Sequence, residues 1–100
     1  MVDVVEVAKA LASAPRLKIL GWLKDPDAHF VSRRPGDLGP AGVCASLIAQ
    51  KAGISPPTAS RHLDVLRRAG LIETERIAGW SFHRRNPAGL DLAHQLLDDI

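Results

Sequence analysis

Apolar residues recur at helical spacing in most of the chain. Groups that repeat every three or four positions are separated by Pro, Gly and Ser, the residues that start and stop helices. In the second group Leu17, Leu20 and Leu23, helped by Ile19, are expected to face the core. The pattern predicts helices over residues 3–13, 15–24, 43–51, 55–70 and 87–100.

Two short stretches alternate apolar and polar residues instead. Residues 71–77 are rich in β-branched side chains, and residues 80–85 alternate aromatic and polar ones. Ala78 and Gly79 between them make a turn. We therefore predict a β-hairpin, with Trp80 and Phe82 packing it onto the helices.

Residues 25–42 contain too many prolines and glycines for one continuous regular element. We expect a long surface connection there. Residues 29–31 form either a short strand or a loop anchored by Phe30, and Val43 is a candidate for a small edge strand.

The third and fourth helices have the order of a helix-turn-helix. Gly53 permits the tight turn, and Ser55 before a proline is well placed to cap the following helix. Ala59, Leu63 and Leu66 share one side of that helix. The other side carries Arg61, Asp64, Val65 and Arg68.

A helix-turn-helix followed by a hairpin predicts a fold that is mainly α with a small β-hairpin wing, in one domain over residues 1–100. A helix fits the DNA major groove, where each base pair shows its own donors and acceptors. Arg61 is our first candidate for a base contact, and wing arginines are expected on the sugar-phosphate backbone. The predicted DNA-binding residues are Gln50, Lys51, Ser55, Thr58, Ser60, Arg61, His62, Arg76, Arg84 and Arg85. For His62, packing within the protein is an equal alternative.

Two segments, residues 14–20 and 48–72, resemble the ArsR family of winged-helix repressors. The stretch from Ser55 to Ile72 is the most specific, and residues 76–87 fit the family's wing. Family members are typically homodimers that leave their operators when an effector binds. The resemblance therefore implies a dimeric repressor, but it identifies no effector.

Charge is unevenly distributed although the net charge is only +2. The formal charges are +1 over residues 1–50, +4 over residues 51–86 and −3 over residues 87–100. A basic middle suits an anionic partner such as duplex DNA. Both terminal helices have broader apolar faces than a small core can cover, which predicts a homodimer formed through them.

Several classes are not expected. The single cysteine, Cys44, excludes an internal disulfide, and no stretch is long and apolar enough for a membrane span. With no secretion signal either, we expect a cytoplasmic protein. No nucleophile, base and orienting group can be nominated together, so no enzyme is predicted. The alternative function is a winged-helix protein-interaction module without DNA binding.

A metal site and a cofactor are not expected either. Soft-metal binding needs several thiolates, and Cys44 stands alone. A site on the last helix would need Asp91, His94, Asp98 and Asp99 together, with partners from a second subunit. The other weighed cluster, Asp25, Asp27 and His29, is equally typical of a polar loop.

Overall fold

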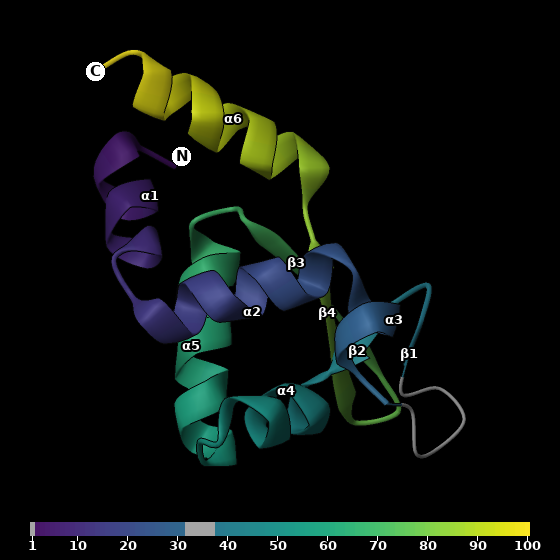
Figure 1. Cartoon of the computed structure of the whole chain (residues 1–100). Coiled ribbons are helices and arrows are strands. Elements are labelled where there is room, and N and C mark those ends of the chain that lie inside the picture. The colour runs from purple at the N-terminus through teal and green to yellow at the C-terminus, as the bar shows by residue number, and fades with distance from the viewer. Residues whose placement is uncertain (1, 32–37) are drawn as a thin grey trace.

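The computed structural model describes residues 2–31 and 38–100. Within these ranges a helical body carries a four-stranded antiparallel sheet (Figure 1). The elements are α1 (Val4–Leu11), α2 (Ala14–Lys24), α3 (Pro26–His29), β1 (Leu38–Gly39), β2 (Gly42–Cys44), α4 (Ala45–Ala52), α5 (Pro56–Arg68), β3 (Ile72–Ile77), β4 (Trp80–Arg85) and α6 (Pro87–Asp98). The predicted winged helix-turn-helix is confirmed.

Side-chain caps fix where three of the helices begin. Asp3 Oδ1 accepts a hydrogen bond from the Glu6 amide at 2.9 Å, at the start of α1. Ser13 caps α2 and Ser55 caps α5 in the same way, each over 3.3 Å. Each cap satisfies one of the amides that a helix start leaves without a partner. These local signals explain why the predicted starts fall within two residues of the observed ones.

One hydrophobic core joins α1, α2, α4, α5, the start of β3 and α6. Its largest fully buried side chains include Ile19, Ile48, Leu66, Leu71 and Ile72. Helix α2 crosses in front of α5 and the strands in the view of Figure 1, and its apolar face closes the core on that side.

The prediction that Leu17 faces the core was wrong. The buried residues of α2 are Ile19, Leu20 and Leu23, whereas Leu17 is 52% exposed. At about 100° per residue, Leu17 lies roughly 110° from the centre of that buried arc. It therefore points away from the core and adds to the apolar surface of the protein.

The sheet has the strand order β1-β2-β4-β3, so it is larger than the predicted hairpin. Val43 was expected on an edge strand, but β2 pairs with β1 on one side and β4 on the other. Gly42 makes this possible because a Cβ there would overlap the carbonyl oxygen of His83. Its φ of +113° also favours glycine.

The described part of residues 25–42 contains more regular secondary structure than the surface connection that the sequence predicts. It holds α3 and β1, and residues 32–37 lie outside the described ranges. Of the two alternatives for residues 29–31, the anchored loop is right: Phe30 is buried and its ring packs edge-on against Trp22, 6.3 Å between centroids.

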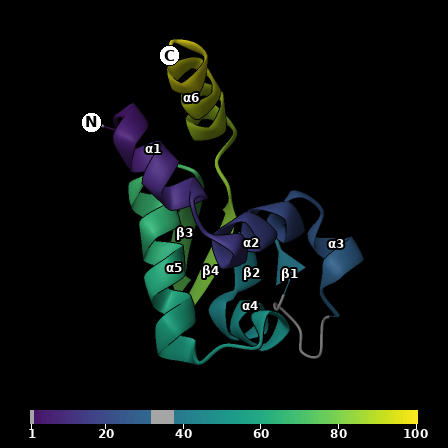
Figure 2. The same ribbon diagram turned by 60° about the vertical axis from the view of Figure 1, so that its left-hand side comes forward.

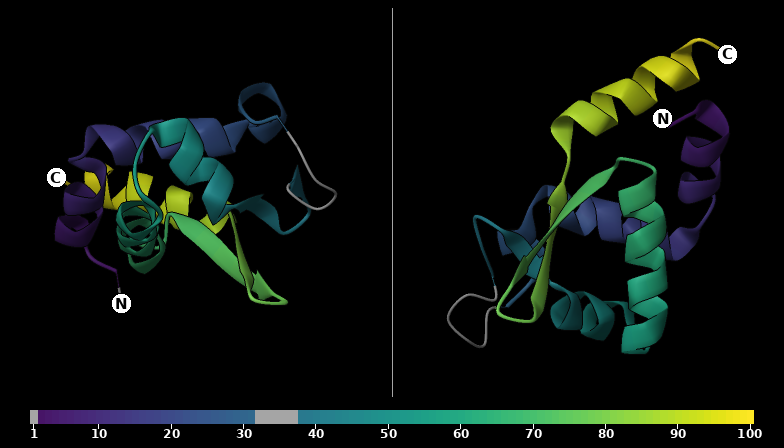
Figure 3. Two further views of the ribbon diagram at one scale, coloured as in Figure 1. Left: turned by 90° about the horizontal axis from the view of Figure 1, so that it is seen from below. Right: turned by 180° about the vertical axis from the view of Figure 1, so that it is seen from behind.

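The β3–β4 hairpin is confirmed and projects away from the helices as a wing (Figure 3). Its turn residues, Ala78 and Gly79, both have positive φ, as a two-residue type I′ turn requires. Trp80 follows the turn and lines a pocket with Ala45 of α4 and Pro56 of α5, but it is 46% exposed, so it packs the hairpin onto the helices only in part. Phe82, two residues further from the tip, is half-buried.

Helix α6 leaves the sheet and lies beside α1 (Figures 1 and 2). Asn86 precedes it, but the Asn86 side chain makes no cap and instead donates to the Gly70 carbonyl oxygen at 3.0 Å. Only Ala93 of α6 is buried, and Ile100 beyond its end is 89% exposed. Leu90, Leu96 and Leu97 are half-buried and pack against the core, so the large apolar residues of this segment that remain exposed are Leu92 and Ile100.

Candidate nucleic-acid interface

Helices α4 and α5 form the helix-turn-helix, joined by a short turn at Gly53. Gly53 adopts the left-handed conformation with φ of +67°, and Ile54 N donates to Ala49 O at 3.1 Å. The bond closes the end of α4 and sends the chain into Ser55, which caps α5. The turn thus fixes the direction in which α5 leaves α4.

Helix α5 presents a polar side to solvent. Ala59, Leu63 and Leu66 are buried on its inner side. Arg61 is exposed on the opposite side, together with Val65 and Arg68. The predicted orientation of the helix is confirmed, and it leaves the Arg61 guanidinium facing outward.

His62 faces the body of the protein. Its Nδ1 lies 3.1 Å from Nη1 of Arg16, at the start of α2. Partial burial, and then the neighbouring Arg16 charge, lower the pKa of His62 below its ordinary value. Nδ1 of His62 is therefore already bonded within the protein. Of the two alternatives for His62, this contact favours packing within the protein over a DNA contact through Nδ1.

The side chains around the turn differ in whether they are exposed or already in contact with other groups of the chain. Gln50 and Ser60 are exposed. Ser55 Oγ donates to Thr58 Oγ1 at 2.9 Å and accepts from the Thr58 amide. Lys51 Nζ lies over the rings of Trp22 and Phe30, 5.2 and 5.8 Å from their centroids. Lys51 is thus directed toward α2, not along α5.

The three predicted wing arginines have three different environments. Arg84 donates to Glu73 at 2.9 Å, to Glu75 at 3.3 Å and to the Ala41 carbonyl at 3.1 Å. Arg85 donates to the Leu20 carbonyl in α2 at 2.8 Å. Arg76 is exposed and, among the described residues, makes no hydrogen bond or ion pair. Of the three guanidinium groups, that of Arg76 is the one left to an external anion.

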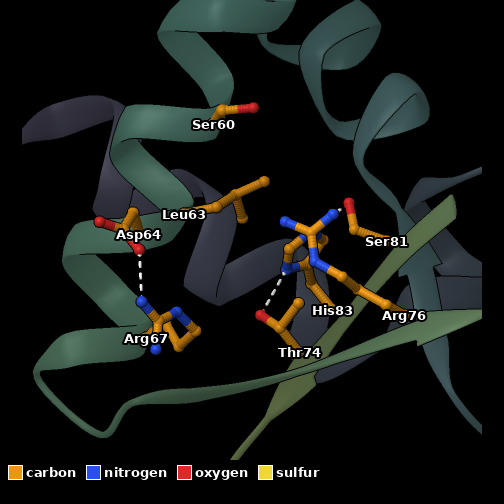
Figure 4. Close-up of a pocket in the computed structure, with 8 residues that line it drawn as sticks. All are labelled: Ser60, Leu63, Asp64, Arg67, Thr74, Arg76, Ser81 and His83. Atoms are coloured by element: carbon orange, nitrogen blue, oxygen red, sulfur yellow. Dashed lines mark hydrogen bonds and ion pairs between the residues drawn. The ribbon is translucent and has the colours of Figure 1, made fainter. Parts of the chain in front are cut away.

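A hollow separates α5 from the wing (Figure 4). Two turns of α5 form one wall, and alternate residues of β3 and β4 form the other. It is lined by Ser60, Leu63, Asp64, Arg67, Thr74, Arg76, Ser81 and His83. We call it the helix–wing hollow.

The floor of the helix–wing hollow is a buried hydrogen-bond chain. His83 Nδ1 lies 2.9 Å from Thr74 Oγ1, and its Nε2 lies 3.2 Å from Ser81 Oγ. Burial, and then the charge of Arg76, lower the pKa of His83 to about 4. The imidazole is therefore neutral near pH 7.

Sequence reasoning missed this hollow, although a signal for it exists. Thr74 pairs with His83 and Arg76 pairs with Ser81 across the hairpin. Residues two apart on a strand share a face, so these four side chains belong together once the two-residue turn sets the register. Arg67 was missed because it lies at the edge of the polar side of α5.

The described residues contain no group of three or more metal-binding side chains. They also contain no helix long and apolar enough to cross a membrane. Cys44 is buried, and its Sγ lies 3.3 Å from Ser46 Oγ.

The chain is similar to known regulators in sequence. Residues 36–75 match a model of a helix-turn-helix domain. Over 82 residues the chain is 45% identical to the uncharacterized HTH-type transcriptional regulator YbzH of Bacillus subtilis, covering 82% of each protein.

Solved structures share the fold. One is the homodimeric winged helix-turn-helix DNA-binding domain of a possible ArsR-family transcriptional regulator from Mycobacterium bovis. It is 31% identical with a TM-score of 0.63, over 94% of this chain and 71% of that one. Another ArsR-family regulator is 17% identical with a TM-score of 0.70, over 94% and 81% of the two chains. The antimony-specific repressor AntR is 23% identical with a TM-score of 0.62, over 95% and 74%.

Proposed function

The chain belongs to the ArsR family of winged helix-turn-helix transcriptional regulators, and we propose that it represses transcription as a homodimer bound to its operator. In this proposal α5 is the recognition helix and lies in the major groove. The wing follows the neighbouring sugar-phosphate backbone into the minor groove. The observation that carries the proposal is the outward Arg61 side of α5, opposite a fully packed inner side.

Arg61 is proposed as the base-reading residue, because a forked guanidinium matches the two acceptors of a guanine edge. Ser60 and Thr58 lie one turn or less from it and suit base edges or phosphates. Gln50 and Ser55 are proposed to contact the backbone near the start of α5, where the helix dipole favours an anion. For Lys51 to contact the DNA backbone as well, its ammonium group would have to move away from the rings of Trp22 and Phe30.

On the wing, Arg76 is the proposed phosphate contact. Arg84 and Arg85 already donate to acceptors within the chain. In the proposal they stiffen the wing and tie it to α2, and their contribution to DNA affinity is smaller than that of Arg76.

Dimer formation is proposed through the terminal helices. Val5, Leu17 and Leu92 are 56%, 52% and 44% exposed, and Ile100 is 89% exposed. Val5, Leu92 and Ile100 belong to α1 and the α6 segment, and these elements lie at the end of the molecule away from the α4–α5 turn (Figure 1). Leu17 belongs to α2, which crosses the middle of the molecule. A two-fold dimer through this surface would set two recognition helices about 34 Å apart, on successive major grooves.

The charge distribution is consistent with this arrangement. The three carboxylates of the last fourteen residues, Asp91, Asp98 and Asp99, lie on or next to α6. Helix α6 lies at the opposite end of α5 from the start of α5 (Figures 1 and 2). The acidic surface would thus be held away from the DNA phosphates.

The affinity of the full chain for duplex DNA at two salt concentrations tests the proposal. A protein that neutralises several phosphates releases their counterions, so its affinity falls steeply as salt rises. We expect this fall for duplexes that the chain selects from a random pool. Absent or salt-insensitive binding would instead favour the winged-helix protein-interaction module.

A further inference from the structure

The helix–wing hollow lies between the two parts of the protein that the proposed function puts in neighbouring DNA grooves. One sugar-phosphate strand separates a major groove from the adjacent minor groove. With α5 in the first and the wing in the second, that strand has to cross the hollow between them. The inference below therefore rests on the proposed function and specifies one contact within it.

We propose that the helix–wing hollow seats one backbone phosphate of this strand, with Arg76 as its main donor, the Ser81 hydroxyl beside Arg76 and the Ser60 hydroxyl on the opposite, α5 wall. Arg76 reaches from β3 across the floor of the hollow, above His83 (Figure 4). It has no internal acceptor among the described residues, unlike Arg84 on the next strand. A guanidinium and two hydroxyls are the donor types that proteins commonly direct at phosphate oxygens.

The one carboxylate in the hollow is neutralised within α5. Asp64 accepts a hydrogen bond from Arg67 at 2.6 Å and forms an ion pair with Arg68 at 2.9 Å. The pKa of Asp64 is lowered, chiefly by the Arg67 hydrogen bond. The hollow is thus lined by two arginines, Arg67 and Arg76, and by one carboxylate that Arg67 and Arg68 already pair, so the local charge favours an anion.

Ser81, next to His83 at the floor of the hollow, supplies a further hydrogen-bond donor for the phosphate. His83 is neutral, so only one of its nitrogens carries a proton. With that proton on Nε2, His83 donates to Ser81 Oγ and accepts from Thr74 at Nδ1. The hydroxyl hydrogen of Ser81 is then left for the phosphate, and the buried imidazole holds that hydroxyl in place.

The test combines Arg76→Gln with neutral methylphosphonates. The probe is a duplex that the wild-type chain selects from a random pool, made with one phosphate at a time replaced by a methylphosphonate. We expect one position per half-site, between the two grooves, where the replacement weakens wild-type binding. The same replacement should have little further effect on Arg76→Gln.

The salt dependence gives a second readout. Arg76→Gln removes one phosphate contact per half-site, so the dimer loses two, and the slope of log affinity against log salt should fall by about two. The ratio of wild-type to Arg76→Gln affinity should therefore shrink about twelvefold when salt rises fourfold. Lys24→Gln is the matched control, because it removes one exposed positive charge at the end of α2, outside the lining of the helix–wing hollow. It should leave the slope unchanged.

The outcomes are distinguishable. If wild-type binding is absent or insensitive to salt, the proposed function itself fails. If the wild type binds but no methylphosphonate position couples to Arg76, or Arg76→Gln keeps the full slope, the phosphate seat is overturned and the DNA-binding function stands. Thermal unfolding of Arg76→Gln shows whether this exposed substitution leaves the fold intact.

Discussion

Nη1 of Arg16 lies 3.1 Å from Nδ1 of His62, and this contact ties the start of α2 to the recognition helix. The same guanidinium donates from Nε to Ala10 O at 2.7 Å and from Nη2 to Lys9 O at 2.9 Å. Arg16 therefore closes the last turn of α1 while it holds α5. A guanidinium only donates, so Nδ1 of His62 must accept and the imidazole must be neutral.

Replacing Arg16 by Met should raise the pKa of His62 toward its ordinary value. The substitution removes both the like charge and the donor that requires a neutral ring. An NMR titration of the His62 ring measures this. Lys18→Met, on an exposed position of the same helix, is the control and should leave the titration unchanged. A His62 pKa that is equal in both variants would contradict the assigned contact.

The buried His83 gives the fold a pH dependence of its own. Its folded pKa of about 4 lies below the value of 6.5 for an unperturbed histidine. The unfolded chain therefore binds more protons between these values, and stability falls as pH drops from about 6.5 toward 4. The complete effect is about 3 kcal/mol. Urea unfolding across this range should show it, and His83→Gln should flatten the curve. An unaltered curve in the variant would assign the effect to other groups.

The recognition helix shows what the sequence alone can predict. Ser55, the prolines after it and the spacing of Ala59, Leu63 and Leu66 are local signals, and all were read correctly. The two-residue turn at Ala78 and Gly79 also sets the hairpin register. That register puts Glu73 opposite Arg84, so this ion pair was within reach of the sequence although it was not predicted.

Other features depend on contacts that no local pattern encodes. Strand β2 has three residues, and it is a strand because β1 and β4 lie on either side of it. Arg85 finds its acceptor in α2, 65 residues away in the chain. The apolar residues of α2 fit two choices of inward-facing side, one of which includes Leu17. Packing against α5 and the sheet selected the other, which is centred near Leu23.

Helix α6 packs closely against the end of α5, where Gly89 lies next to Gly70. A Cβ on Gly89 would overlap the carbonyl oxygen of Gly70 and lie 2.8 Å from its carbonyl carbon. Gly89→Ala should lower the free energy of unfolding by about 1–3 kcal/mol, because backbone has to move. Gly21→Ala is the matched control, since nothing lies within 4 Å of its Cβ position in α2. It should raise stability by about 0.5–1 kcal/mol. Equal effects in chemical denaturation would contradict the close approach.

The proposed dimer surface can be tested without DNA. Leu92→Glu places a charge on the exposed apolar side of α6, so it should convert a dimer to monomers in sedimentation equilibrium. Ile77→Glu, near the wing tip, is the matched control, because the two side chains are 44% and 48% exposed. It should leave the mass unchanged. A dimer that survives Leu92→Glu would move the interface away from α6.

The central claim is that the Arg61 side of α5 reads bases, and selection of duplexes from a random pool by the wild type and by Arg61→Ala tests it most directly. If Arg61 reads a base, the variant should lose about 1–3 kcal/mol of affinity for the selected site and relax its preference at one position per half-site. All other positions should keep their preference. A uniform loss across sequences, or no loss at all, would contradict the claim.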